Sequence, residues 1–296
     1  MRRYFLLLLV GLVAVEGKSQ VSEIGLCGGA SFYMGDLNPK GVFMGSRPAG
    51  GLVYRYNINP RFAFKANALF GSLQASDAKT GTPERNLSFR SPVSELSAQI
   101  ELNFLRLYNE KGKNFFSPYV FLGVGIFAFN PQAELSGQWW DLQPMGTEGQ
   151  DLNCKDPVTG IMYDEKRYSL TNVAIPFGLG IRFNFLEYYS AGFEWGFRKT
   201  FTNYIDDVGG TYVDRDLFLI MRDSRIADLS DRTTAIKPDG SPDYNEAGNM
   251  RANNTNTTDW YSFAVISFTF KLNYSKNCQA SAANPSYKKI KKVKRH

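Results

Sequence analysis

Histidine and cysteine are both scarce in this 296-residue chain. The only histidine is His296, the last residue, so no Ser-His-Asp triad, histidine zinc site or histidine general base can be built inside a domain. The three cysteines, Cys27, Cys154 and Cys278, are too few for a disulfide framework in a chain of this length. These absences argue against an enzyme, and we expect no catalytic residues, no metal site and no cofactor.

Long apolar runs are also missing from most of the chain. After residue 19, no stretch reaches the roughly 18 apolar residues that a membrane-spanning helix needs. The first residues differ, because Arg2 and Arg3 precede an apolar stretch at 4–15, and Gly17 and Ser19 are small residues before Gln20. That order is typical of a secretory signal peptide. We expect residues 1–19 to be removed; an uncleaved anchor is the alternative, although the apolar stretch is short for a bilayer.

The net charge of +6 is concentrated at the end of the chain. Segment 275–296 is rich in lysine and has no acidic residue, whereas the body between it and the signal peptide is slightly acidic. We therefore treat 275–296 as a separate basic periplasmic tail, which can bind an acidic partner or anionic groups of the membrane or cell wall. A solvated terminus is the alternative. The candidate partner-binding residues are Lys288, Lys289, Lys291, Lys292, Lys294 and Arg295.

Alternation of apolar and polar side chains recurs throughout the body of the chain. Between 94 and 104, Leu96, Ile100 and Phe104 share one parity, while Glu95 and Glu101 share the other. Such a period of two is typical of a strand with one apolar and one polar face. The same pattern gives eight strand candidates: 23–34, 51–58, 61–72, 94–104, 118–129, 172–185, 191–198 and 260–274.

The connections between these strands alternate in length. Short ones lie at 57–60, 106–117 and 187–188, and longer ones at 36–47, 76–90, 134–167 and 206–258. This predicts that residues 20–274 form an all-β, eight-stranded antiparallel transmembrane barrel of the outer membrane, with short periplasmic turns and long extracellular loops. A soluble β-barrel or sandwich is the alternative. A further hairpin around 211–222 would raise the strand count.

Volume decides which row of side chains faces the lumen. The interior of an eight-stranded barrel holds only a few layers of side chains, so the large apolar rows fit better against lipid. The polar rows combine glycines with charges of nearly balanced sign, which predicts a plugged lumen held by salt bridges rather than a diffusion pore. The predicted lumenal charge network consists of Glu23, Arg55, Lys65, Glu95, Glu101, Arg182, Glu194, Arg198 and Lys271.

Two stretches resemble a known family. They are Tyr33-Met-Gly-Asp-Leu-Asn-Pro39 and the segment YRYNINPRFAFKANALFG at 54–71. Both are similar to the PorG-type outer-membrane barrels of the type IX secretion system. The sharp motifs cover only the first third of the chain, and the long fourth loop and the basic tail match no motif of that family.

The resemblance implies a non-enzymatic component of the secretion machinery. Its expected partners are outer-membrane lipid and the periplasmic ring proteins of PorK and PorN type, with no nucleic acid and no small-molecule substrate. The alternative is a structural or adhesin-type outer-membrane barrel that acts through its long surface loops.

Overall fold

The computed structural model describes residues 21–39, 43–80, 82–105, 115–185, 188–252 and 257–272. The predicted signal peptide, the basic tail with its six candidate partner-binding residues, and Cys278 lie outside the described residues.

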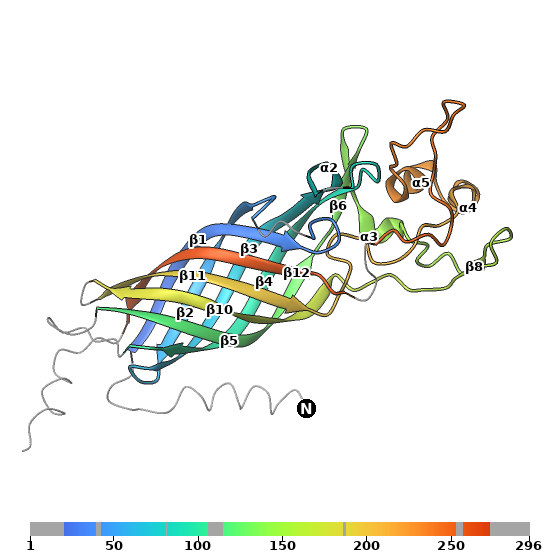
Figure 1. Ribbon diagram of the computed structural model, residues 1–296. Coiled ribbons are helices and arrows are strands. Elements are labelled where there is room, and N and C mark those ends of the chain that lie inside the picture. The colour runs from blue at the N-terminus through green and yellow to red at the C-terminus, as the bar shows by residue number, and fades with distance from the viewer. Residues whose placement is uncertain are drawn as a thin grey trace, which may run out of the picture.

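Eight long strands form a closed antiparallel barrel (Figure 1). Each strand pairs with its neighbours along the chain, β1 pairs with β12, and the β3–β4 and β4–β5 pairings complete the ring. The predicted eight-stranded barrel is confirmed. Its strands are β1 (Val21–Met34), β2 (Arg47–Asn57), β3 (Phe62–Ser76), β4 (Ser88–Asn103), β5 (Phe116–Phe129), β10 (Thr171–Asn184), β11 (Tyr189–Thr200) and β12 (Trp260–Lys271).

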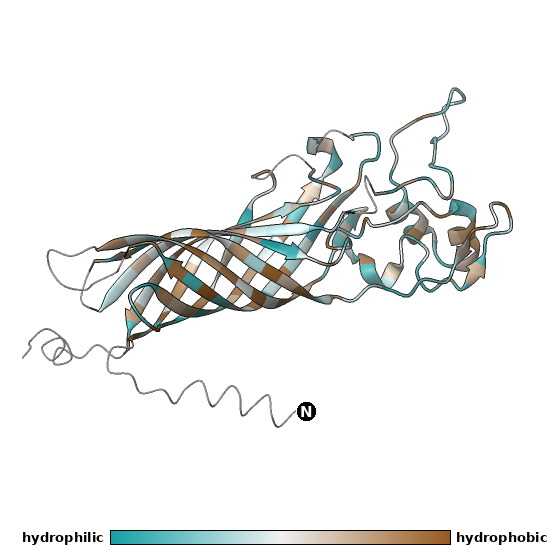
Figure 2. Ribbon diagram, turned by 60° about the horizontal axis from the view of Figure 1, so that its bottom comes forward, coloured by the Kyte–Doolittle hydropathy of each residue, from teal (hydrophilic) through white to brown (hydrophobic). Residues whose placement is uncertain are grey.

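The apolar row of each strand lies on the outside of the barrel. Leu26, Leu122 and Phe268 are 66%, 60% and 62% exposed, whereas the charged Glu101 and Arg198 on the opposite parity are fully buried. In Figure 2 hydrophobic residues recur along the strands of the barrel. An apolar belt of this extent in water would be strongly unfavourable, so it identifies the barrel as one of the outer-membrane type, with lipid on the outside.

The strands β3 and β4 extend beyond the rest of the barrel. Their pairing reaches Ser76 and Ser88, while the pairing of β2 with β3 reaches only Gly50 and Phe70. The prediction of a loop over 76–90 was therefore wrong at both ends of that segment. The short helix α2 (Asp77–Thr80) follows β3 at this raised rim.

The two longest connections fold together at the same end of the barrel. We call their described residues within 130–170 and 201–259 the loop cap, and we call this end of the barrel the loop end and the opposite end the turn end (Figure 1). No described helix is long and apolar enough to span a membrane. The cap contains β6 (Gln132–Leu135), β7 (Gln138–Asp141), α3 (Leu142–Met145), β8 (Cys154–Lys155), β9 (Met162–Tyr163), α4 (Arg215–Met221) and α5 (Ser224–Ser230).

The alternative of an additional barrel hairpin around 211–222 was wrong. Residues 215–221 form α4 instead, and the Asp214 carboxylate caps this helix by accepting a hydrogen bond from the Asp216 amide. Leu217 and Phe218 of α4 are buried in an apolar cluster of the cap, which stabilises the helix through packing. The strand contribution of this segment is limited to a single bridge between Thr211 and Met250.

Replacing Leu122 with Arg tests the position of the apolar belt. Leu122 lies midway along β5 on the outer face, so a charge there would enter the hydrocarbon and lower the free energy of unfolding by about 2–4 kcal/mol. The measurement is a denaturant titration of protein refolded into lipid vesicles. Val158→Arg is the control, because Val158 is 81% exposed in the loop cap and should change stability little. Equally small effects of both variants would contradict a lipid-facing belt.

Candidate functional site

All nine side chains of the predicted lumenal charge network are buried within the barrel. The strands β1, β2, β3, β4, β10, β11 and β12 each contribute at least one of them. The structure arranges them in two groups. The larger group, which we call the turn-end network, contains Glu23, Arg55, Lys65, Glu101, Arg182, Glu194 and Lys271, and the smaller is the pair Glu95–Arg198.

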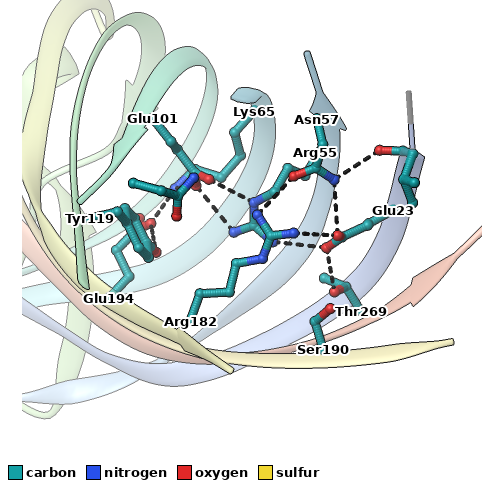
Figure 3. A network of polar contacts seen from close by, with 12 residues as sticks. Glu23, Arg55, Asn57, Lys65, Glu101, Tyr119, Arg182, Ser190, Glu194 and Thr269 are labelled. Atoms are coloured by element: carbon teal, nitrogen blue, oxygen red, sulfur yellow. Dashed lines mark hydrogen bonds and ion pairs between the residues drawn. The ribbon is translucent and has the colours of Figure 1, made fainter. Parts of the chain in front are cut away.

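Two arginines hold Glu23 in the turn-end network (Figure 3). Arg182 Nη2 lies 2.5 Å from Glu23 Oε1, and Arg55 Nη1 lies 3.3 Å from Glu23 Oε2. Arg55 also donates to both oxygens of Glu101, at 2.8 and 3.1 Å. The Thr269 hydroxyl donates to Glu23 at 2.9 Å, and Lys271 lies directly opposite Glu23 on the neighbouring strand. Glu23 therefore faces more than one cation.

Lys65 continues the chain of ion pairs across the lumen. Its ammonium lies 3.0 Å from Glu101 Oε1 and also contacts Glu194. The Tyr119 hydroxyl donates to Glu194 Oε2 at 2.8 Å, and the ammonium stands 4.5 Å from the centre of the Phe121 ring. Burying one charge costs several kcal/mol, so a set of this size is tolerated only where each member has such partners.

The second group lies nearer the loop end. Arg198 donates to both oxygens of Glu95, at 2.9 and 3.3 Å, in a forked arrangement. The Tyr261 hydroxyl donates to the same carboxylate at 2.9 Å, and the guanidinium carbon lies 4.7 Å from the centre of the Phe263 ring.

The lumenal side chains of this part of the barrel are almost completely buried. Glu23, Lys65, Arg198 and Tyr33, in order from the turn end to the loop end, are between 0 and 1% exposed. In an open channel such side chains would contact water along their length. The arrangement therefore fits a rigid plug, as expected when side chains fill a barrel of eight strands.

Above the Glu95–Arg198 pair, the barrel mouth is closed by a cluster that sequence reasoning missed. We call this the mouth cluster: Tyr33, Leu37, Ile205, Asp206, Val208 and Asp259. The Tyr33 hydroxyl oxygen lies 2.6 Å from Asp206 Oδ2 and 2.7 Å from Asp259 Oδ1. The backbone amides of Leu37 and Val208 donate to Asp206, and that of Ile205 donates to Asp259.

The motif at 33–39 builds this cluster. Asn38 donates from its side-chain amide to the Tyr33 carbonyl and from its backbone amide to the Gly35 carbonyl, which closes the turn. A Cβ atom on Gly35 would lie about 2 Å from Asp259 Oδ1 and from the Tyr33 hydroxyl, so only glycine fits there. Leu37 is thereby placed in the apolar cluster that lines the upper lumen.

A second buried polar group ties the mouth cluster to the loop cap. Arg251 Nη1 donates to Glu148 Oε1 at 3.1 Å and to the Asp207 carbonyl at 2.5 Å. Thr147 and Tyr168 donate to the Asp207 carboxylate at 2.5 and 2.6 Å. Burial raises the pKa of Glu148 to about 6, in spite of the neighbouring Arg251, and burial likewise raises the pKa of Asp207.

The signal for these residues was present but ambiguous. Asp206-Asp207 lies a few residues after β11 ends at Thr200, and Asp259 immediately precedes β12, so both acids are close to the end of the barrel where it opens. Asp206 belonged to a predicted long loop, and neither acid carried a prediction of its own. Only the return of the 53-residue connection to the mouth, which a single sequence does not encode as a pattern, brings Asp206 and Asp259 together.

The described residues contain no group of three or more His, Cys, Asp or Glu side chains that could hold a metal ion. Cys27 and Cys154 are both free thiols, the first in β1 and the second in the loop cap.

A family model described as a domain of unknown function, DUF6089, matches residues 2–139. The match includes both stretches, 33–39 and 54–71, that carry the resemblance to the PorG-type barrels. No curated protein matches the chain.

Several solved structures are similar to the chain in their overall path. Ail, the attachment invasion locus protein of Yersinia pestis, is 9% identical, with a TM-score of 0.35 and coverage of 86% of this chain and 97% of Ail. The N-terminal β-barrel domain of Pseudomonas aeruginosa OprF is 10% identical, with a TM-score of 0.32 and coverage of 87% and 100%. Neisserial surface protein A is 7% identical, with a TM-score of 0.34 and coverage of 86% and 97%. The assignment of the fold depends on the geometry of this chain itself.

Removing one anion from the turn-end network tests its role in stability. Glu101→Gln leaves Arg55 and Lys65 buried with one carboxylate fewer between them, and we expect the free energy of unfolding to fall by about 3–5 kcal/mol. Denaturant titration in detergent micelles measures the change. Glu84→Gln, the same substitution at an exposed loop position, should stay within about 0.5 kcal/mol of wild type. A similar small change in both variants would show that the network does not support the barrel.

Adding one methyl group tests the packing of the motif. Gly35→Ala forces the Tyr33 hydroxyl or the Asp259 carboxylate to move, and we expect a loss of about 1–3 kcal/mol. The midpoint of thermal or denaturant unfolding reports it. In Gly28→Ala the new methyl group meets no atom within 4 Å on the outside of β1, so that variant is the matched control. Equal stability of the two variants would refute the close packing around Gly35.

Proposed function

We propose that this chain is a non-catalytic outer-membrane component of the type IX protein secretion machinery, which anchors the periplasmic ring of PorK and PorN type to the membrane. The observation that carries the proposal is the filled lumen. A barrel whose interior is occupied by ion pairs between six strands is a rigid anchor and has no room for a transported solute. Such a barrel acts through the protein contacts that it makes outside the membrane.

The resemblance of residues 33–39 and 54–71 supplies the type of machinery. In this chain the first of these stretches closes the mouth, and the second forms the end of β2, the turn that follows and most of β3. The two stretches thus belong to the mouth and to the wall of the barrel, which fits a role as a stable membrane anchor.

The contact with the ring would lie at the turn end, which faces the periplasm in barrels of this class. The β2–β3 turn there is ordered, because the Asn59 side chain accepts hydrogen bonds from the amides of Arg61 and Phe62 at 2.8 and 2.9 Å. Ile58, which lies in this turn, is 44% exposed and offers an apolar contact to a partner. The basic tail, 275–296, is the other proposed docking element.

A second candidate function is that of a surface-acting structural or adhesin-type barrel. It is favoured by the loop cap, which would lie outside the cell. Leu219, Ile220 and Met221 at the end of α4 are 47%, 80% and 48% exposed, an unusual run of apolar side chains for a surface helix. A contact made there would be independent of the periplasmic ring.

Co-purification separates the two candidates. A tagged full-length chain, extracted in mild detergent, should bring down the ring lipoprotein and its partner. A chain lacking residues 285–296 should no longer bring down these two ring proteins if the tail is their binding site. The Arg61→Glu variant should no longer bring them down if the β2–β3 turn is their binding site. Ile220→Ser is the control, because it changes only the loop cap. Recovery of the barrel alone, together with normal secretion in a deletion strain, would overturn the secretion role and favour the surface role.

A further inference from the structure

The mouth cluster contains a feature that neither the anchor role nor the lumenal plug requires. Asp206 and Asp259 are 1% and 0% exposed, and both contact the oxygen of a single tyrosine hydroxyl. That oxygen carries one hydrogen, so it can donate to only one of the two carboxylates. The other contact, also shorter than 2.8 Å, is a hydrogen bond only if the second carboxyl group carries a proton and donates it to the tyrosine oxygen. The geometry therefore requires that one of the two carboxyl groups carries a proton, in addition to the hydrogen of the tyrosine hydroxyl.

Among the residues that the structure describes, no cation is hydrogen-bonded to either carboxylate in place of that proton. The remaining hydrogen bonds to the two acids come from backbone amides, at 3.3 Å from Leu37, 3.0 Å from Val208 and 2.9 Å from Ile205. Arg85 interacts electrostatically with Asp206, but its guanidinium is hydrogen-bonded to Asp77 at 2.6 and 2.7 Å. The charged groups around the pair are Asp36 of the first loop, Asp77 and Arg85 of the β3–β4 connection, and Asp207 and Arg251 of the loop cap.

We propose that Tyr33, Asp206 and Asp259 form a proton-binding site that works as a latch, holding the first loop and the loop cap on the barrel mouth while the proton is bound and releasing them when it leaves. Three chain segments meet at this site: β1 supplies the tyrosine, the start of the fourth long loop supplies Asp206, and the end of that loop supplies Asp259. The backbone amides that donate hydrogen bonds to the two carboxylates belong to Leu37, Ile205 and Val208. These three residues are also the apolar residues inserted into the mouth. Loss of the proton leaves two buried like charges with one hydroxyl hydrogen between them.

The direction of the pH dependence follows from burial. Burial raises the pKa of Asp259 to about 7, in spite of the hydrogen bond from Tyr33, and burial together with the charge of Asp259 raises the pKa of Asp206 as well. A carboxyl group whose pKa is raised on folding stabilises the closed form most below its ordinary value near 4. That stabilisation is lost as the pH rises through about 7. The latch is therefore closed in mildly acidic surroundings and open in alkaline ones. It does not depend on the secretion role.

Hydrogen exchange tests the latch directly, because the reporting amides are the ones bound to the two carboxylates. Purified full-length protein in detergent micelles is exchanged at about pH 6 and about pH 8, and peptides covering 35–39 and 203–209 are analysed by mass spectrometry after correction for the intrinsic exchange rate. One proton with a pKa near 7 predicts a roughly tenfold fall in protection between these pH values. Peptides from β5 should show no such fall, since the barrel itself stays closed.

Two variants decide the outcome. In Asp259→Asn the amide donates permanently to the tyrosine oxygen, so protection should stay at the acidic level at both pH values. Asp243→Asn is the matched control at an exposed loop position and should keep the tenfold fall. Tyr33→Phe removes the shared hydroxyl and should show weak protection at both pH values. Retained heat-modifiable mobility on gels shows that each barrel is folded. A wild type without the fall, an Asp259→Asn variant that keeps it, or a Tyr33→Phe variant as protected as wild type would each overturn the latch.

Discussion

A charge inside a narrow barrel must have a partner within reach, and this requirement organises the lumen. A barrel of eight strands is so narrow that side chains from opposite walls meet in the lumen, and water is excluded between them. Under these conditions an unpaired carboxylate or ammonium would cost several kcal/mol. The chain satisfies the requirement with forked guanidinium–carboxylate pairs at Arg55 and Arg198, and with Lys65 placed between two acids. The apolar exterior and the closed interior are two consequences of the same parity along each strand.

The mouth solves a similar problem with different chemistry. There the acids outnumber the nearby cations that could bind them, and hydrogen-bond donors come from backbone amides and one tyrosine. Backbone amides fix the loops in place but do not neutralise charge, so neutrality at Asp206 and Asp259 has to come from a proton. The turn-end network balances its buried carboxylates with arginine and lysine side chains, whereas the mouth is sensitive to pH. The barrel is thus filled by ion pairs at the turn end and closed at the mouth by a cluster that depends on a bound proton.

The sequence predicted the barrel because its information is local. Alternation at 94–104 is visible in the residues themselves and placed Glu95 and Glu101 on the inner row, as alternation at 191–198 did for Arg198. The ends of β3 and β4 were misjudged because their extension beyond the rim carries few apolar residues, so the alternation that marks the other strands fades there. The α4 segment was ambiguous because a short amphipathic stretch of seven residues resembles a weak strand until Asp214 is seen to cap it.

The pairing of the mouth acids could not be predicted for a different reason. Asp206 and Asp259 are separated by a long connection whose path depends on packing in the loop cap, and on contacts such as the one between Arg251 and Glu148. Nothing in the spacing of the two aspartates states that one tyrosine lies between them. The motif at 33–39 was recognised as a family likeness, and only the structure shows that Tyr33, Gly35 and Asn38 each have a separate task there.

The ion pairs of the lumen join strands that are far apart in the chain. Arg182 on β10 binds Glu23 on β1, and Lys65 on β3 binds Glu194 on β11, across separations of 159 and 129 residues. Neither contact can form in a half-built sheet, because the two walls meet only when the first and last strands have paired. A partly assembled barrel would therefore hold several unpaired charges beside lipid, and would be strongly disfavoured relative to the finished one. The lumenal ion pairs therefore stabilise only the closed barrel, which couples membrane insertion and ring closure into one cooperative event.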